Sequence, residues 1–268
     1  MRWTIATIML VCAVNVFAAI RSDTIPYEAG GVTMQGTLVY DDAAAASRPG
    51  VVVFPEIWGA NDYAKSRGRM LAESGYVAFV ADMYGGGKTI EEPKEAFAIA
   101  EILYAQPKVI IDRAVAAVTT LRTSGKADPS RIAAIGYCMG GGIALNLAFV
   151  GADLKTVVAF HASLVKRVPE MGQIKASILV LNGAADKLVS PQETQDFIAM
   201  MQAANAKWEL VILRNAMHSY TNPNSDTYKA LGTVGYNASA DKRSWQLMLT
   251  QLDEAMDYRH TSAGTATP

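Results

Sequence analysis

The sequence predicts a single α/β domain, with a mostly parallel central sheet covered by helices on both faces. From residue 51 onward, short β-branched apolar runs alternate with helical patterns, which is typical of βαβ units. These runs are continuously apolar rather than alternating, which indicates strands buried on both faces. The chain has 268 residues, of which 51% are hydrophobic, and this suffices for one large core.

The strands are predicted from apolar runs that end in glycine or polar residues. The first is Val51-Val52-Val53-Phe54, and the full set of predicted strands is 51–54, 76–81, 132–136, 156–160, 178–182 and 208–213. Two earlier segments, 24–28 and 32–40, are expected to add an antiparallel edge.

Helix boundaries are predicted from capping and stop residues. Asn61-Asp62 can cap a helix that Gly75 ends, and Pro191 fits the first turn of a later one. The predicted helices are 62–74, 91–105, 107–122, 139–149, 191–204 and 241–258.

The first 18 residues are predicted to be a secretory signal peptide. Arg2 precedes an apolar run over residues 5–17, and Val16-Phe17-Ala18 fits a cleavage site. The run is short for a membrane span, so no stable span is expected after cleavage, although an uncleaved anchor is the alternative. The mature protein is expected to be exported, periplasmic or secreted, with one domain over residues 22–260 and a disordered tail over 261–268.

The net charge and the cysteine content narrow the range of possible functions. The net charge of −1 shows no basic excess, so nucleic acid is not an expected partner. Of the two cysteines, Cys12 would leave with the signal peptide, and Cys138 alone would remain. A lone thiol in an exported protein is either a small buried hydrophobe or a reactive group. No cluster has metal-ligand spacing, so neither a metal nor an organic cofactor is expected.

Cys138 lies in a motif that favours the reactive interpretation. Gly136-Tyr137-Cys138-Met139-Gly140 has the G-x-nucleophile-x-G form, between a predicted strand and a predicted helix. In this motif a sharp turn exposes the nucleophile at the edge of the sheet, and the following amide, here that of Met139, points into the site.

Suitable partners for the thiol follow later strands. Asp186 comes after the strand at 178–182, and His218 comes after the strand at 208–213, in the order nucleophile, acid, histidine. A loop-capping role is the alternative for Asp186. Of the other histidines, His260 falls at the start of the tail, and His161 could line the pocket or cap a strand. The arrangement predicts an activated nucleophile.

With these residues the chain resembles the dienelactone hydrolase family of α/β-hydrolases. The resemblance rests on "PEIWG" (55–59), "GYCMGG" (136–141), "NGAADKLVS" (182–190) and "MHSY" (217–220). It implies the α/β-hydrolase fold, with Cys138 as nucleophile, His218 as general base and Asp186 as its orienting partner. It also implies that Glu56 gates the thiol, although a salt-bridged loop acid is the alternative. The backbone N–H groups of Ile57 and Met139 would form the oxyanion hole.

The resemblance is incomplete where relatives bind substrate. Family members that process ring-cleavage lactones hold the substrate carboxylate with arginines. At those positions this sequence has Gly85-Gly86-Gly87 followed by Lys88, and Asn222. We therefore expect hydrolysis of an ester or lactone, rather than of dienelactone itself.

Some features remain open to two interpretations. Trp58, Tyr84 and Tyr220 could line the substrate pocket or belong to the core, and the polar segment 222–245 could cover the site or simply connect two elements. Alternative functions are a broad carboxylesterase or thioesterase on the same site, and a non-catalytic exported binding protein. A thiol redox protein is a third, but it would usually have a second cysteine.

Overall fold

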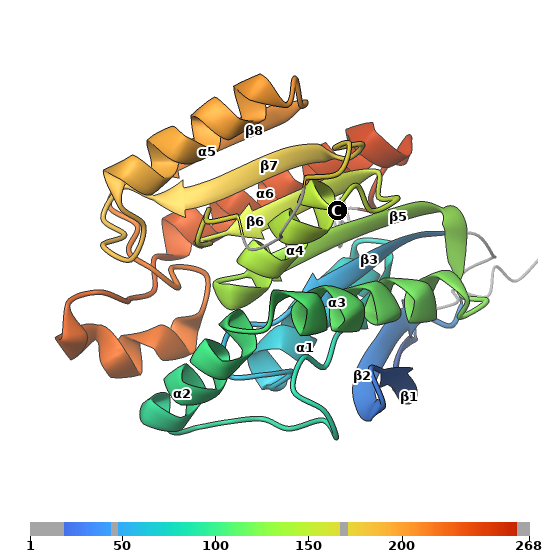
Figure 1. Cartoon of the computed structure of the whole chain (residues 1–268). Helices are drawn as coiled ribbons and strands as arrows, with labels where there is room; N and C mark the ends of the chain where they lie inside the picture. The colour runs from blue at the N-terminus through green and yellow to red at the C-terminus, as the bar shows by residue number, and fades with distance from the viewer. Residues whose placement is uncertain (1–18, 44–47, 167–170, 262–268) are drawn as a thin grey trace, which may run out of the picture.

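The protein is built around one eight-stranded sheet. The structure, a computed structural model, describes residues 19–43, 48–166 and 171–261, so the predicted signal peptide and residues 262–268 lie outside the described residues. The strand order is β1-β2-β4-β3-β5-β6-β7-β8 (Figure 1). The strands are β1 (Ile20–Ala29), β2 (Val32–Asp41), β3 (Arg48–Phe54), β4 (Val77–Val80), β5 (Ala127–Tyr137), β6 (Thr156–Phe160), β7 (Ser177–Gly183) and β8 (Trp208–Leu213).

Strands β3 to β8 are parallel, and β1 and β2 add the predicted antiparallel edge. β2 pairs antiparallel with both β1 and β4, whereas β4, β3, β5, β6, β7 and β8 pair parallel in that spatial order. The edge hairpin is longer than predicted and spans residues 20–41. Because the other strands are parallel, their carboxyl ends meet at one edge of the sheet, where open α/β sheets hold their sites.

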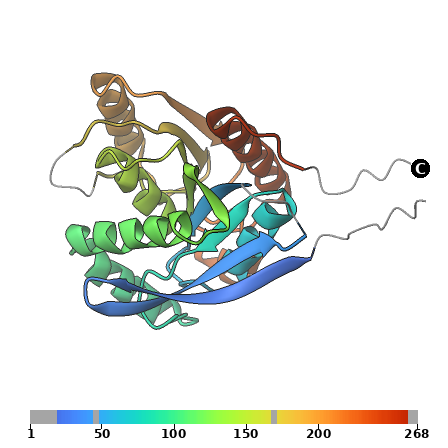
Figure 2. The same ribbon diagram turned by 90° about the vertical axis from the view of Figure 1, so that its right-hand side faces the viewer.

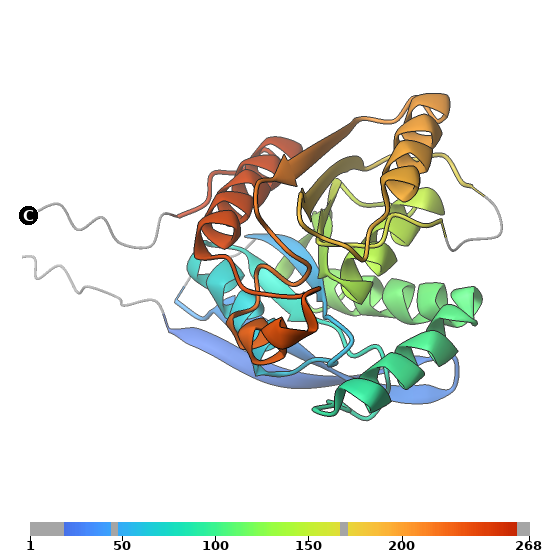
Figure 3. The same cartoon turned by 90° about the vertical axis from the view of Figure 1, so that its left-hand side faces the viewer.

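Helices cover both faces of this sheet (Figures 2 and 3). α2, α3, α4 and α5 contribute buried side chains to the core on one face, whereas α1 and α6 contribute to the core on the other. The helices are α1 (Asp62–Glu73), α2 (Pro93–Tyr104), α3 (Pro107–Arg122), α4 (Met139–Phe149), α5 (Pro191–Ala203), the 3₁₀ helix η1 (Pro223–Leu231) and α6 (Ala238–Met256).

The continuous apolar strands are explained by these two cores. In β3, Val52 and Phe54 point into the core beneath α2 to α5, whereas Val51 and Val53 point into the core beneath α1 and α6. Successive side chains of a strand point to opposite faces, so a strand buried on both sides is apolar at nearly every position. The predicted fold class is therefore confirmed.

Some elements differ clearly from the predictions. β5 begins at Ala127 rather than 132, because residues 127 and 128 pair with β3 across a register shift. η1 lies in the segment 222–245, where no helix was predicted. α6 begins at Ala238, since the side chain of Asn237 accepts from the N–H of Ala240. Within the described residues, no helix is both long and apolar enough to cross a membrane.

Candidate active site

Cys138 occupies the sharp turn between β5 and α4. Its backbone has φ 53° and ψ −116°, a conformation that is strained for a residue with a side chain. The turn also brings its neighbours into close contact. A Cβ on Gly136 would lie 2.0 Å from the carbonyl oxygen of Gly140, and one on Gly140 would lie 2.1 Å from that of Phe54. The glycines flanking Cys138 are therefore required by this geometry.

His218 and Asp186 form a buried pair at the same edge of the sheet. Asp186 follows β7 and His218 follows β8, and Nδ1 of His218 lies 2.8 Å from Oδ2 of Asp186. The second carboxylate oxygen of Asp186 accepts from the N–H of Leu188, which fixes the carboxylate. Because Nδ1 is engaged, Nε2 is the nitrogen available for proton transfer. Nε2 is buried and has no hydrogen-bond partner among the described residues.

The charge of His218 is coupled to Cys138. Burial disfavours the charged imidazole, but a thiolate on Cys138 and the hydrogen bond to Asp186 outweigh burial and raise the pKa of His218 to about 10. The structure thus brings the three residues predicted from the sequence to one place. An imidazole so placed can take the thiol proton and hold it.

Glu56 lies in the turn after β3, and its carboxylate is buried. Oε1 accepts from the hydroxyl of Ser219 and Oε2 accepts from the amide of Asn222, each at 2.6 Å. Burial raises the pKa of Glu56 above its usual value, while these two hydrogen bonds act in the opposite direction. Glu56 therefore forms a buried hydrogen-bonded cluster with the segment after His218, rather than a loop salt bridge.

The two residues predicted to form the oxyanion hole follow neighbouring strands of the sheet. Met139 is the first residue of α4, and Ile57 follows Glu56 in the turn after β3. β3 and β5 are adjacent in the sheet, so both residues follow neighbouring carboxyl ends. The hydroxyl of Tyr84 donates to the carbonyl oxygen of Ile57 at 2.7 Å. Tyr84 thus holds this turn in place.

His161 is fully buried beside the nucleophile. Its Nδ1 accepts from the backbone N–H of Cys138 at 3.1 Å, and its Nε2 lies 2.8 Å from the hydroxyl of Thr221. Burial, together with the charges of His218 and Arg67, lowers the pKa of His161 well below its usual value. It therefore supports the backbone of the nucleophile, a role that sequence position alone could not distinguish from a strand cap.

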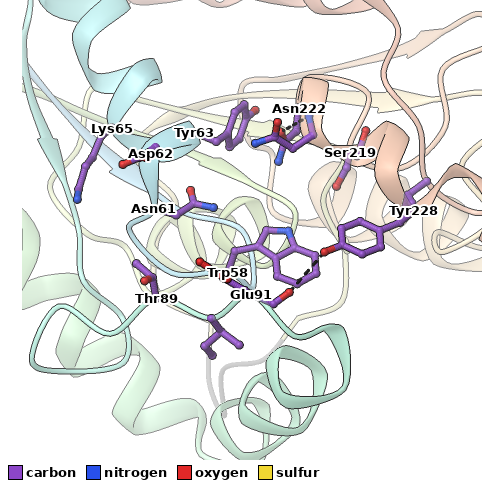
Figure 4. A pocket seen from close by; sticks show the side chains of 14 residues that line it. Trp58, Asn61, Asp62, Tyr63, Lys65, Thr89, Glu91, Ser219, Asn222 and Tyr228 are labelled. Carbon is purple, nitrogen blue, oxygen red and sulfur yellow. Dashed lines mark hydrogen bonds between the residues drawn. The ribbon is translucent and has the colours of Figure 1, made fainter.

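A cavity of about 500 Å³ adjoins the hydrogen-bonded cluster around Glu56 (Figure 4). Trp58 and Tyr228 line it with stacked rings whose centroids are 5.5 Å apart. Ser219 and Asn222, the two residues that hold Glu56, also line it. Tyr220 does not have the predicted pocket role, because its side chain is fully buried in the core and its hydroxyl donates to the carbonyl oxygen of Leu181.

Comparison with known proteins shows the family to which the chain belongs. The family model described as "Dienelactone hydrolase family" matches residues 34–256. The chain belongs to the dienelactone hydrolase family. It is thus a carboxylic ester or lactone hydrolase with the α/β-hydrolase fold.

Three individual proteins similar to this chain share between 27% and 35% of the aligned residues with it. A dienelactone hydrolase-like promiscuous phosphotriesterase from metagenomic libraries is 34% identical, with a TM-score of 0.83, covering 88% of this chain and 99% of that one. The structure m3DLH is 35% identical, with a TM-score of 0.86, covering 89% and 99%. A Salmonella typhimurium protein provisionally named carboxymethylenebutenolidase is 27% identical over 77% of each chain.

Two positions where the resemblance led us to expect arginines hold other residues. Lys88, next to the expected place of one arginine, pairs with Glu95 at 2.9 Å on the surface. Asn222, at the expected place of the other, bonds Glu56 instead. The segment 222–245 does more than connect elements, since Asn224, Ser225, Tyr228 and Val234 line the cavity.

Several other residues of the site were not predicted from the sequence. Ser219 could have been suspected, since it is part of the "MHSY" motif. Thr221 and Ser225 had no local signal, because a hydroxyl in a polar loop looks the same whether it is buried or exposed. No group of three or more potential metal ligands occurs within the described residues.

Proposed function

We propose that this family member is a cysteine-dependent hydrolase that acts through a Cys138–His218–Asp186 triad and a thioester intermediate. One observation carries the proposal: a strained cysteine at the start of α4 is coupled to a histidine whose other nitrogen is held by Asp186. A broad carboxylesterase or thioesterase would use the same residues. A non-catalytic binding protein would not need the strained backbone of Cys138.

In the first half of the reaction the enzyme is acylated. His218 holds the proton of the thiol, and the Cys138 thiolate attacks the carbonyl carbon of the ester or lactone. The carbonyl oxygen becomes an oxyanion, for which the N–H groups of Ile57 and Met139 are the proposed donors, each worth about 3 kcal/mol in the transition state. The carbon–oxygen bond of the ester then breaks, and Nε2 of His218 gives its proton to the departing alkoxide.

In the second half water releases the acid. Neutral His218 takes a proton from a water molecule, and the resulting hydroxide attacks the thioester carbon. The carbon–sulfur bond breaks, and the sulfur leaves as thiolate beside protonated His218. Asp186 holds the ring in one orientation through both halves, because it binds Nδ1 throughout.

Glu56 has a separate proposed role as a gate for the thiol. A carboxylate beside a thiol disfavours thiolate formation, because two adjacent anions repel each other. In this structure Ser219 and Asn222 bind both carboxylate oxygens of Glu56. Because both oxygens are engaged, Glu56 does not compete with His218 for the proton of the Cys138 thiol. The proposal requires Glu56 to leave this position in another state of the enzyme.

We also propose that the enzyme is exported, on the basis of the charged start, apolar run and cleavage motif of residues 1–18. Expression of the full chain in a bacterial host tests this. The protein should be recovered from the periplasm or medium, with a new N-terminus after residue 18. Recovery only from the cytoplasm with residues 1–18 intact would contradict the proposal.

Hydrolysis of short p-nitrophenyl esters tests the central proposal, with Cys138→Ala and Cys138→Ser measured alongside the wild type. Activity should be lost in Cys138→Ala, and an acyl group of the expected mass should be trapped on Cys138 of the wild type. Activity that persists in Cys138→Ala would refute the thioester mechanism. Turnover of dienelactone much faster than of simple esters would contradict the expected substrate range.

A second candidate activity is slow hydrolysis of phosphotriesters. It is suggested by the 34% identity to the promiscuous phosphotriesterase over 88% of this chain. The same thiolate would attack phosphorus and release the alkoxide, and water would then break the sulfur–phosphorus bond. Release of p-nitrophenol from paraoxon beyond a single equivalent would support turnover, whereas a single equivalent would indicate inactivation.

A further inference from the structure

Hydrogen bonds hold both peptide groups that flank the α-carbon of Ile57. In the preceding peptide, the carbonyl oxygen of Glu56 accepts from the N–H of Gly59 at 3.1 Å. This peptide is trans, so the N–H of Ile57 points opposite to that carbonyl, away from Gly59. In the following peptide, the carbonyl oxygen of Ile57 accepts from the hydroxyl of Tyr84 at 2.7 Å. These two bonds together set the direction of the Ile57 N–H.

The N–H groups of Ile57 and Met139 are both unengaged by the backbone. Within the described part of the chain, neither N–H donates to a backbone carbonyl oxygen, although both residues are buried. Buried N–H groups are paired in the great majority of cases. An oxyanion formed on the substrate would pair them, which supports the oxyanion role proposed for both residues.

The hydroxyl of Tyr84 lies beside both of these residues. Tyr84 follows β4, which is the neighbour of β3, and β3 is in turn the neighbour of β5. Besides its bond to Ile57, the hydroxyl lies 3.9 Å from Sδ of Met139. Burial and the charge of Cys138 raise the pKa of Tyr84 above its usual value, so the hydroxyl keeps the proton that it donates.

Tyr84 is itself held in place by Asp82. The buried carboxylate of Asp82 accepts from the backbone N–H groups of Gln35, Tyr84, Gly85 and Gly87 at 2.8 to 3.0 Å. Gly85 and Gly87 have φ values of 107° and 72°, which favour glycine. In this loop the resemblance led us to expect an arginine. Here the loop instead wraps around Asp82 and directs Tyr84 towards the turn that contains Ile57.

Backbone bonds also join this loop to the turn. The N–H of Ile90 donates to the carbonyl oxygen of Trp58 at 3.0 Å, and Gly59 forms an antiparallel bridge with Thr89. These bonds do not depend on the side chain of Tyr84. The loop and the turn should therefore stay together when the hydroxyl of Tyr84 is removed.

We propose that Tyr84 is a positioning residue for the oxyanion hole, because its hydroxyl holds the Ile57 peptide with the N–H of Ile57 facing the reacting carbonyl oxygen. Tyr84 acts through the backbone of Ile57 rather than by contact with the substrate. An oxyanion forms in both halves of the reaction, when the Cys138 thiolate attacks the ester carbon and when water attacks the thioester carbon. Tyr84 should therefore affect both halves equally. This inference rests on the proposed function.

Tyr84→Phe tests the proposal, since it removes the hydroxyl and keeps the ring. We expect kcat on p-nitrophenyl acetate to fall at least about tenfold, because complete loss of an oxyanion donor costs about 10²–10³ in kcat. KM should stay the same, because acylation and deacylation slow by similar factors.

Tyr258→Phe is the matched control. The hydroxyl of Tyr258 donates to the carbonyl oxygen of Gly75 at 2.9 Å, just before β4 begins and therefore at the sheet edge opposite the site. Both variants lose one hydrogen bond from a tyrosine to a backbone carbonyl, so each melting temperature should fall by a similar amount, about 2–4 °C. Only Tyr84→Phe should lower kcat.

An inhibitor that forms an oxyanion provides a second readout. The Cys138 thiolate adds to the carbonyl carbon of 1,1,1-trifluoroacetone, and the π electron pair of the carbonyl moves to its oxygen. The adduct carries the charge of the tetrahedral intermediate but has no leaving group. Its inhibition constant should rise in Tyr84→Phe by about the factor by which kcat/KM falls, and it should be unchanged in Tyr258→Phe.

The outcomes separate this proposal from the proposed function. A raised KM with unchanged kcat in Tyr84→Phe would overturn the proposal and make Tyr84 a substrate contact. Equal losses of kcat in Tyr84→Phe and Tyr258→Phe, or an unchanged inhibition constant for trifluoroacetone in Tyr84→Phe, would also overturn it. Failure of the proposed function would instead be seen as activity on p-nitrophenyl esters that survives Cys138→Ala.

Discussion

The backbone N–H of Cys138 is shared between Nδ1 of His161, at 3.1 Å, and the carbonyl oxygen of Phe160, at 3.0 Å, although Cys138 and His161 lie 23 positions apart. Because Nδ1 accepts, a neutral His161 carries its proton on Nε2, and Nε2 therefore donates to Thr221 at 2.8 Å. The hydroxyl of Thr221 also lies 2.6 Å from that of Tyr63 on α1. The strained turn is thus tied through the core to a helix on the face covered by α1 and α6.

We predict that His161 positions the nucleophile through this hydrogen bond. His161→Leu should lower kcat on p-nitrophenyl acetate about tenfold or more, because misplaced reacting groups are costly to the rate. His161→Asn places an oxygen near the position of Nδ1 and should recover most of the lost kcat. KM should change little in either variant. Equal losses in the two variants would indicate that His161 only fills space.

The raised pKa of His218 predicts a broad activity plateau. The negative sulfur of Cys138 and the carboxylate of Asp186 raise the pKa of His218 to about 10, so His218 should carry its proton over the neutral pH range. The departing alkoxide needs that proton, so kcat/KM should stay level from neutral pH to about 9 and fall as the pH passes 10. A stopped-flow pH profile measures this. A fall centred near pH 6.5 would contradict it.

A direct titration should isolate the contribution of the Cys138 thiol to the pKa of His218. Cys138→Ala removes the negative sulfur that favours the imidazolium, so the pKa of His218 should fall in this variant while the bond to Asp186 remains. NMR signals of the His218 ring, followed against pH in both proteins, report the two values. An unchanged pKa in Cys138→Ala would show that the thiol and the imidazole are not coupled.

We predict that Asn222 stabilises the fold through Glu56. Asn222→Ala removes the amide that donates to Oε2 of Glu56 and leaves a buried carboxylate oxygen without this partner. The free energy of unfolding should fall by about 1–3 kcal/mol, the usual cost of an unsatisfied buried group. Urea denaturation measures the change. Asn224→Ala is the control, since its side chain is exposed, and it should have the smaller effect on stability.

The close packing of α4 against the sheet predicts different effects of two neighbouring glycine substitutions. A Cβ at position 140 would lie 2.1 Å from the carbonyl oxygen of Phe54, whereas one at position 142 would have its nearest contact at 3.4 Å. Gly140→Ala should therefore lower stability by about 1–3 kcal/mol or more through overpacking. Gly142→Ala should be neutral or slightly stabilising, because alanine favours a helix. Equal melting temperatures would contradict this account.

The sequence by itself determined the fold class and the candidate triad. It also determined the order in which the nucleophile, the acid and the histidine follow strands along the chain. Apolar runs without alternation require a sheet covered on both sides, and the carboxyl ends of parallel strands meet at one edge. Cys138, Asp186 and His218 each follow such a strand, so their meeting could be predicted from periodicity and a turn motif alone. Local signals of this kind act over a few residues and are visible in one dimension.

Only the tertiary structure decided which polar groups are buried together. The bonds from Ser219 and Asn222 to Glu56 join residues more than 160 positions apart, and those of His161 and Thr221 cross between different parts of the core. Tyr220 and Trp58 looked alike as aromatic residues near a motif, yet one is packed in the core and the other lines the cavity. Such long-range pairings depend on how elements pack in three dimensions, and no local propensity encodes them.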